Sequence, residues 1–135
     1  IRSAALIIEL SQVSEQQLFT HHAMTTDKLL GYFRNALLRT GAYSDERLAT
    51  EQVREAIDIH VLCEKDINGQ RYVKEIAEIV PESEGGVRVL YRYHDGCYKA
   101  EQKPTSKLLE RMIERVGKKE EKNLCNFFGG GVETS

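Results

Sequence analysis

The sequence predicts a mixed α/β fold, in which helices come first, an antiparallel β-meander follows, and another helix comes after it. Apolar residues recur at helical spacing up to Ala56, and the pattern changes to alternation at Ile57. Two tight-turn pairs, Asn68-Gly69 and Asp95-Gly96, then separate segments of strand-like composition. At 135 residues the chain has the size of one domain.

Two helices are predicted from apolar stripes in the first 41 residues. The stripe of the first, over residues 3–13, consists of Leu6, Leu10 and Val13. Thr26 is expected to cap the second helix, and Gly41 suits its C-terminal end. The apolar positions of this second helix are Leu29, Leu30, Phe33, Ala36 and Leu37.

A third helical stretch is predicted from a cap at Ser44 or Thr50 to Ala56. The pair Leu48-Ala49 is a point at which this stretch could divide into two short helices. The meander begins directly after this helical stretch.

Residues 17–22 predict a short buried strand that carries Leu18 and Phe19. The chain offers this strand no parallel neighbour, although a buried strand in an α/β fold needs one. The chain also begins, at Ile1, directly in an apolar segment, which we interpret as a cut. The pattern therefore fits the tail of a larger α/β domain better than a self-contained one.

The meander is predicted from residue 57 to residue 100. Ile57, Ile59, Val61 and Cys63 are expected to share one face of the first strand, with His60 on the other face. Residues 71–80 form the partner strand, which ends at Pro81. A further strand starts after Gly85-Gly86, and its shared face holds Val87, Val89, Tyr91 and Tyr93.

The last clear helix opens at Pro104 and Ser106, and a charged stretch, residues 118–122, follows it. The apolar stripe of this helix consists of Leu108, Leu109, Met112, Ile113 and Val116. Leu124, Phe127 and Phe128 are expected to form a small apolar anchor. Residues 129–135 have the composition of a flexible tail.

The composition excludes several classes of function. A formal net charge of −2, with acids among the bases, gives no general attraction to nucleic acid. No apolar run approaches the roughly 20 residues that span a bilayer. The cysteines are odd in number and irregularly spaced, which favours free thiols in a reducing compartment; they are Cys63, Cys97 and Cys125.

The densest polar cluster, residues 20–26, follows the predicted strand at 17–22. Ligands of open α/β sheets bind at the carboxyl ends of strands, so a reactive group is expected here. Because neighbours on a strand face opposite ways, His21 and His22 are not expected to point into one site. The simpler interpretation is a histidine that hydrogen-bonds to nearby backbone.

Two other kinds of site are weaker. His94 and Cys97 could bind zinc together with Cys63 and Cys125, but they are more simply residues of a turn and a strand. A Walker A motif is absent, because the single Gly-Lys pair, Gly117-Lys118, lacks the rest of the pattern.

Two stretches in register resemble the secretion ATPase superfamily, which includes type II and type IV secretion, tight-adherence and type IV pilus motors. Thr20-His21-His22-Ala23 resembles the family's histidine box, in which a strand ends in Thr-x-His-Ala. Residues 53–61 and 68–79 resemble the next block, which has an Ala-Ile-Asp strand, a Gly-x-Arg turn and an Ile-x-Glu-Val strand. The resemblance covers about residues 1–100 and is greatest to the tight-adherence and conjugation type.

This resemblance implies that residues 1–100 are the C-terminal part of a RecA-like P-loop ATPase domain. Residues 101–128 would be a C-terminal helical segment, followed by the tail. The intact protein would be a hexamer at the cytoplasmic face of the inner membrane, next to secretion or pilus platform proteins. It would hydrolyse ATP with Mg²⁺ to drive secretion, pilus assembly or conjugative transfer.

The resemblance also implies roles for four residues. His22 would match the box histidine near the γ-phosphate, and Thr20 belongs to the same box. Arg2 would end the family's Gly-Glu-x-Arg segment, and Arg71 stands in the Gly-x-Arg turn, so both are expected to bind the nucleotide. The chain departs from the family at Ala4-Ala5, where a glutamate is usual, and in the helix after the box, where an Arg-Leu pair is common.

Without a Walker A motif, the chain alone is predicted to bind neither ATP nor Mg²⁺ appreciably and to be inactive. An alternative is a non-catalytic interaction module that binds a partner through a sheet edge or through the helix at 107–116. A third, distant alternative is a small metal-dependent hydrolase that uses His21, His22 or His94.

Overall fold

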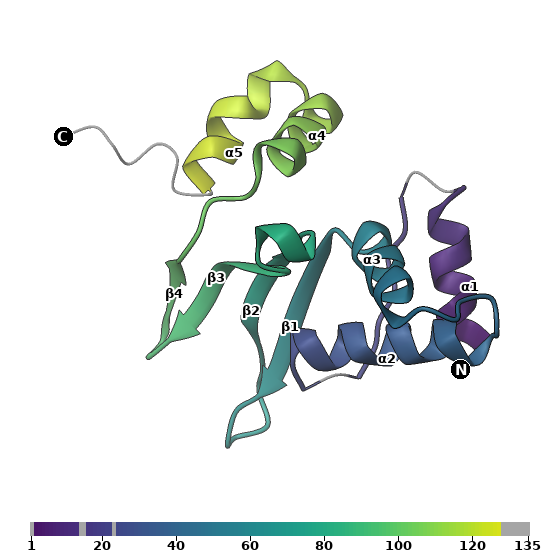
Figure 1. Ribbon diagram of the computed structural model, residues 1–135. Coiled ribbons are helices and arrows are strands. Elements are labelled where there is room, and N and C mark those ends of the chain that lie inside the picture. Colours follow the sequence, from purple (N-terminus) through teal and green to yellow (C-terminus); the bar gives the residue numbers. More distant parts are fainter. Residues whose placement is uncertain (1, 14–15, 23, 128–135) are drawn as a thin grey trace.

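The computed structural model describes residues 2–13, 16–22 and 24–127. It shows a mixed α/β fold with helices around one four-stranded antiparallel sheet (Figure 1). The elements are α1 (Arg2–Ser11), α2 (Thr26–Arg39), α3 (Glu46–Ala56), β1 (Ile59–Lys65), β2 (Arg71–Ile79), β3 (Val87–His94), β4 (Cys97–Ala100), α4 (Ser106–Val116) and α5 (Glu121–Phe127). Ile1, Ala23, Phe128 and the predicted tail at 129–135 lie outside the described residues.

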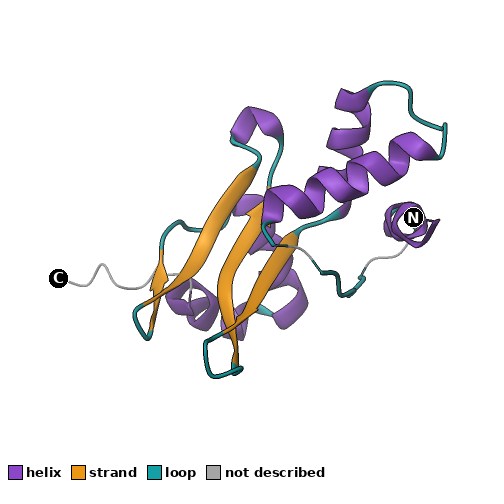
Figure 2. Cartoon of the chain, turned by 90° about the horizontal axis from the view of Figure 1, so that it is seen from below, coloured by secondary structure: helices purple, strands orange, loops and turns teal. Residues whose placement is uncertain are grey.

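The predicted meander is confirmed, with strand order β1-β2-β3-β4 (Figure 2). The hairpin between β1 and β2 closes through Asp66, whose N–H donates to the Gln70 carbonyl at 2.9 Å and whose carbonyl accepts from Gly69 N–H at 3.0 Å. Gly69 has a φ of 79°, which is why glycine suits this position. Strand β1 is therefore an edge strand, and β4 forms the opposite edge.

The core centres on α2. All five apolar positions predicted for this helix are buried, and they pack with residues of α1, α3 and the sheet. Figure 1 shows α1, α2 and α3 grouped at the β1 side of the sheet. The other buried members of this cluster are Ala4, Ala5, Ile8, Ala49, Val53, Ile57 and Ile79.

The buried face predicted for α1 is wrong. Leu6, Leu10 and Val13 are 52%, 45% and 82% exposed, whereas Ala4, Ala5 and Ile8 are buried. This helix has two apolar faces, and its spacing does not tell which of them packs. The small side chains of Ala4 and Ala5 are on the face that meets the other helices.

The strand predicted at residues 17–22 does not form. This segment is extended but belongs to no strand, and Leu18 is 97% exposed. A strand exists only where a neighbour supplies its ladder hydrogen bonds, and all four strands of the described sheet lie beyond residue 58. Phe19 still packs on the core, with its ring centroid 5.4 Å from that of Phe33.

The caps of α2 and α3 are not the predicted residues. Thr25 rather than Thr26 caps α2, and its hydroxyl accepts from Lys28 N–H at 3.2 Å. Asp45 rather than Ser44 or Thr50 caps α3, with its carboxylate accepting from Arg47 N–H at 2.7 Å. Helix α3 then runs unbroken through Leu48-Ala49.

The face predicted for Ile57, Ile59, Val61 and Cys63 is not the buried face of β1. Val61 and Cys63 are exposed, whereas Leu62 is buried and His60 is half-buried. Ile57 is the C-cap of α3 and is buried against the helices, so it does not set the phase of the strand. Because Ile57 precedes the strand and the register with β2 shifts between Leu62 and Cys63, the position of Ile57 does not indicate which face of β1 is buried.

Helix α4 is anchored to the sheet by polar contacts. Thr105 caps the helix, and its N–H and hydroxyl both donate to the buried Glu78 carboxylate. Arg111 makes an ion pair with Asp58 at 2.6 Å. Of the predicted apolar stripe only Leu108 is fully buried, and the Phe127 ring lies 5.3 Å from that of Tyr91.

Arg54 connects α3 to the turn between β2 and β3. Its guanidinium donates to the Gly86 carbonyl at 2.6 Å and pairs with Glu82 at 2.8 Å. Gly86 has a φ of 79° and lies so near this guanidinium that a Cβ would come within 2.9 Å of it. The N-terminal helices are thus tied to the middle of the sheet.

Replacing Phe33 tests the importance of the α2 core. Phe33 is 1% exposed, so Phe33→Ala is expected to lower the free energy of unfolding by about 3–5 kcal/mol. Ile67→Ala is the control, because Ile67 is fully exposed at the hairpin and its loss should change stability by less than about 0.5 kcal/mol. Urea unfolding followed by circular dichroism measures both; equal losses would contradict this description of the core.

Candidate functional site

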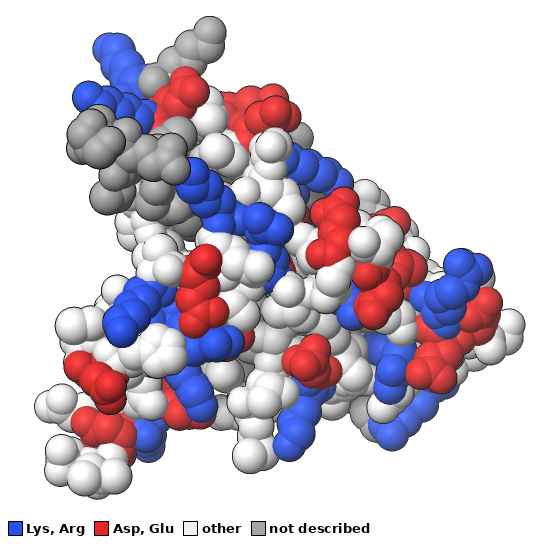
Figure 3. Space-filling view, turned by 60° about the vertical axis from the view of Figure 1, so that its left-hand side comes forward, with Lys and Arg blue, Asp and Glu red and all other residues white. Residues whose placement is uncertain are grey.

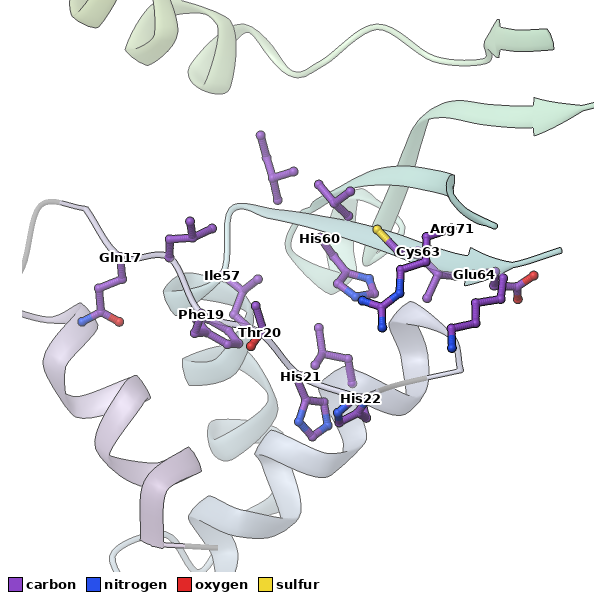
Figure 4. Close-up of a pocket in the computed structure, with 16 residues that line it drawn as sticks. Gln17, Phe19, Thr20, His21, His22, Ile57, His60, Cys63, Glu64 and Arg71 are labelled. Carbon is purple, nitrogen blue, oxygen red and sulfur yellow. The ribbon is translucent and has the colours of Figure 1, made fainter. Parts of the chain in front are cut away.

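A groove of about 750 Å³ lies between the extended segment at 17–22 and strand β1 (Figure 4). One wall is the segment itself, and the other is formed by residues 57 and 59–65. Leu29 of α2 and Arg71 of β2 complete the lining. The groove runs along β1, an edge strand of the described sheet.

Three of the four residues predicted for the site come together in this groove. Thr20, His22 and Arg71 all line it. In the sequence, Thr20 and His22 come before α2 and α3, whereas Arg71 comes after them. Arg2 lies in α1, and the position of its side chain is outside the described part of the structure. His21 also lines the groove.

The expectation that His21 and His22 cannot share a site is wrong, because both line the groove. The alternation behind that expectation holds only for a strand, and this segment is not one. The His21 ring packs against Tyr32 of α2, with centroids 4.5 Å apart. Figure 4 shows both histidines below β1, on the side of the groove toward α2.

His60 is the member of the groove that the sequence did not reveal. It enters the groove from β1, and its Nδ1 lies 2.9 Å from the hydroxyl of the buried Thr26. The same hydroxyl lies 3.4 Å from Oε1 of Glu75, whose Oε2 accepts from Arg92 at 3.0 Å. A chain of four polar side chains therefore runs from the groove to β3. The sequence placed His60 on the face opposite Val61 and Cys63 but did not show that this is the inner face.

Burial lowers the pKa of His60 below its ordinary value of 6.5. The nearby Glu75 carboxylate acts in the opposite direction, and the charge of His21, when that ring is protonated, lowers the pKa of His60 further. The net effect keeps His60 neutral at neutral pH.

The charges of the groove are predominantly positive. Its one carboxylate, Glu64, pairs with Lys74 at 2.6 Å, and the hydrogen bond from Lys74 lowers the pKa of Glu64. Lys65 and Arg71 are cross-strand partners, at the end of β1 and the beginning of β2. Neither has an ion-pair partner among the described residues, so the two cations repel each other without compensation.

A second cavity, of about 350 Å³, lies between α3, the end of β2 and α4. Four of its charged members make contacts within the fold: Arg54 donates to the Gly86 carbonyl, Glu78 accepts from Thr105 at the start of α4, and Arg111 pairs with Asp58. Because these side chains already have partners, this cavity is the weaker candidate.

The zinc candidates are not brought together. His94 and Cys97 are cross-strand partners in β3 and β4, whereas Cys63 lies in the groove at the opposite edge of the sheet. The side chain of Cys125 is outside the described part. Within residues 2–13, 16–22 and 24–127, no three His, Cys, Asp or Glu side chains are grouped to hold a metal ion.

The surface outside the groove carries charges of both signs. On the face seen in Figure 3, Lys and Arg alternate with Asp and Glu and form no continuous basic stripe. Among the helices described, none is long and apolar enough to cross a bilayer.

The fold and the groove define a mixed α/β domain with an open, cationic sheet edge. No known protein family, curated protein or solved structure matches the chain. The resemblance to secretion ATPases therefore stays a prediction.

The lowered pKa of His60 predicts a pH dependence of stability. Between the lowered pKa and 6.5, the unfolded state binds more protons at this group than the folded state does. The stability that the neutral His60 ring contributes to the fold is therefore complete above pH 6.5, and it is lost as the pH falls from 6.5 toward the lowered pKa. Urea unfolding at pH 7.5 and 5.5 should show a smaller decrease for His60→Asn than for the unmodified chain.

Asparagine suits this test because its amide can still donate to Thr26 but does not titrate. His94→Asn, on β3 and outside the groove, is the matched control and should keep the original pH dependence. If His60→Asn kept the pH dependence of stability of the unmodified chain, the attribution of that dependence to His60 would be contradicted.

Proposed function

We propose that this chain is the C-terminal part of the RecA-like ATPase domain of a secretion, pilus-assembly or conjugation motor. The observation that carries the proposal is the convergence of Thr20, His22 and Arg71 on one groove. They come from two separate motifs of the resemblance, and nothing in their local sequence requires them to meet. The groove is then the face of the domain toward the phosphates of ATP.

The donors in the groove fit a phosphate group. A threonine hydroxyl, imidazole N–H groups and a guanidinium all donate hydrogen bonds to phosphate oxygens. Positioned donors of this kind stabilise the charge that develops on a phosphoryl group during transfer. ATP supplies the phosphoryl group and Mg²⁺ neutralises part of its charge, whereas the described residues of this chain group no ligands for the metal.

Each residue has a distinct role in this proposal. His22 donates a hydrogen bond to the γ-phosphate, and Thr20 orients the same group through its hydroxyl. Arg71 offers two parallel N–H donors, a geometry that suits phosphate. Arg2 would contact the nucleotide from α1. In the motor, six copies would form a ring at the cytoplasmic face of the inner membrane and contact the platform proteins there.

The encoded full-length protein provides the direct test. The gene should supply a Walker A motif upstream of Ile1, and the purified protein should hydrolyse ATP with Mg²⁺. His22→Ala should lower kcat by about a hundredfold, because one donor to the transferring group is lost. His94→Ala, outside the groove, should keep full activity.

Two results for the full-length protein would contradict this proposal. One is an encoded protein that has no nucleotide-binding loop. The other is an ATPase whose activity is equally insensitive to both histidine substitutions. Steady ATP turnover by the 135-residue chain alone would also contradict it, since this chain has no Walker A motif.

A non-catalytic interaction module remains the second candidate, favoured by the open edge of β1. Val61 on this strand is 48% exposed, and the sheet has no further strand on that side within the described chain. An exposed edge of this kind accepts an extended peptide as an added strand. A protein without ATPase activity whose β1 amides become protected from hydrogen exchange in the presence of a partner would favour this function.

A further inference from the structure

The proton positions around Thr26 fix the tautomer of His60. A threonine hydroxyl has one proton, and the Glu75 carboxylate, paired with Arg92, can only accept. All contacts are satisfied when Thr26 donates to Glu75 and accepts from Nδ1–H of His60. The ring nitrogen left with a lone pair is then Nε2, and it is the one available to the groove. Protonation at Nε2 adds a charge without breaking the contact to Thr26.

Among the residues that the structure describes, the cations of the groove lack a counter-ion. Lys65 and Arg71 stand opposite each other, while the only carboxylate in the lining is held by Lys74. Like charges directly opposite in a sheet are destabilising, so an anion between them would relieve a repulsion. In Figure 4 the side chains of His60 and Arg71 project from the sheet toward the side where His21 and His22 lie.

We propose that His60, Lys65 and Arg71 form a proton-linked oxyanion site, which binds a ligand with two or more linked phosphate groups and takes up a proton at Nε2 of His60 as it binds. This adds His60 and Lys65 to the groove residues considered above and gives binding a pH dependence. It rests on the proposed function only for the choice of phosphate as the anion.

The groups that face His60 determine the sign of this coupling. They are Thr26 on α2, Glu75 on β2 and His21 on the extended segment, with Arg92 of β3 behind Glu75. In the free chain, burial keeps the ring neutral at neutral pH because it lowers the pKa of His60. An anion in the groove favours the charged ring, so binding raises this pKa and becomes tighter as pH falls.

The first part of the test is the tautomer itself, which needs no ligand. Nitrogen-15 chemical shifts of the histidine rings at pH 7.5 should show His60 with its proton on Nδ1. Thr26→Val removes the hydroxyl at nearly constant volume, and it should move His60 toward the Nε2–H form that predominates in free imidazole side chains. A predominant Nε2–H form in the unmodified chain would overturn the proposal.

The second part is a titration with inorganic pyrophosphate at pH 7.5 and 5.5, followed by amide and imidazole signals. The dissociation constant should decrease at the lower pH, by at most about tenfold per pH unit for one linked proton. His60→Asn should bind more weakly than the unmodified chain, and its dissociation constant should change much less between pH 7.5 and pH 5.5. Retention of the full change in His60→Asn would overturn the proposal.

Exposed cations provide a test that does not depend on titration. Lys65→Gln and Arg71→Gln should each weaken pyrophosphate binding severalfold at both pH values, while their amide spectra stay dispersed as in a folded chain. Lys99→Gln, on β4 at the other edge of the sheet, is the matched control and should have no effect. Equal effects of Lys65→Gln and Lys99→Gln would show non-specific attraction and overturn the site.

These measurements are separable from the ATPase test. Failure of the tautomer and pyrophosphate experiments would leave the effect of His22 on ATP hydrolysis untouched. Conversely, a pH-linked pyrophosphate site in a protein without ATPase activity would support this inference and contradict the proposed function.

Discussion

The burial of one face of α2 is the constraint on which the rest of the structure depends. Phe33 and Leu37 on this face meet α1 and α3, and they give the three N-terminal helices a common core. Ile79 of the sheet joins the same core, so the helices and the meander hold each other in place. Phe19 packs there as well, which fixes the extended segment near β1 although no strand pairing holds it.

The groove is a consequence of this packing. Helix α2 begins between the segment at 16–22 and β1, and Thr26 at its first turn is buried against His60 and Glu75. The same helix thus separates the apolar core from the polar wall of the groove. Its position keeps the two walls apart, and the edge of β1 stays open between them. Natural proteins usually blunt or cover such edges, and the charged side chain of Lys65 on β1 is one feature that does so.

Local patterns in the sequence were sufficient to predict the elements that depend mainly on neighbouring residues. The stripe of α2 and the Asn68-Gly69 hairpin are where the pattern placed them, because a wide apolar face and a turn pair leave little choice. The face of α1 and the phase of β1 depended on distant packing partners, which spacing does not encode. The segment at 17–22 has the composition of a strand, but a strand also needs a neighbour.

The site residues also divide into those that local motifs indicate and those that depend on distant parts of the fold. The resemblance gave Thr20, His22 and Arg71, and the fold brings these three to one groove. It gave no sign of His60, because the role of that ring arises from Thr26 and Glu75, which lie on two other elements. Lys65 and Arg71 became a notable pair only when the register of β1 and β2 placed them opposite each other.

The most direct measurement of the central claim is a crystal structure of the encoded full-length protein with Mg²⁺ and a non-hydrolysable ATP analogue. The account predicts that the γ-phosphate lies in the groove between the segment at 17–22 and β1, within hydrogen-bond distance of His22 or Arg71. A nucleotide bound elsewhere, with the groove filled by another strand of the same protein, would contradict it.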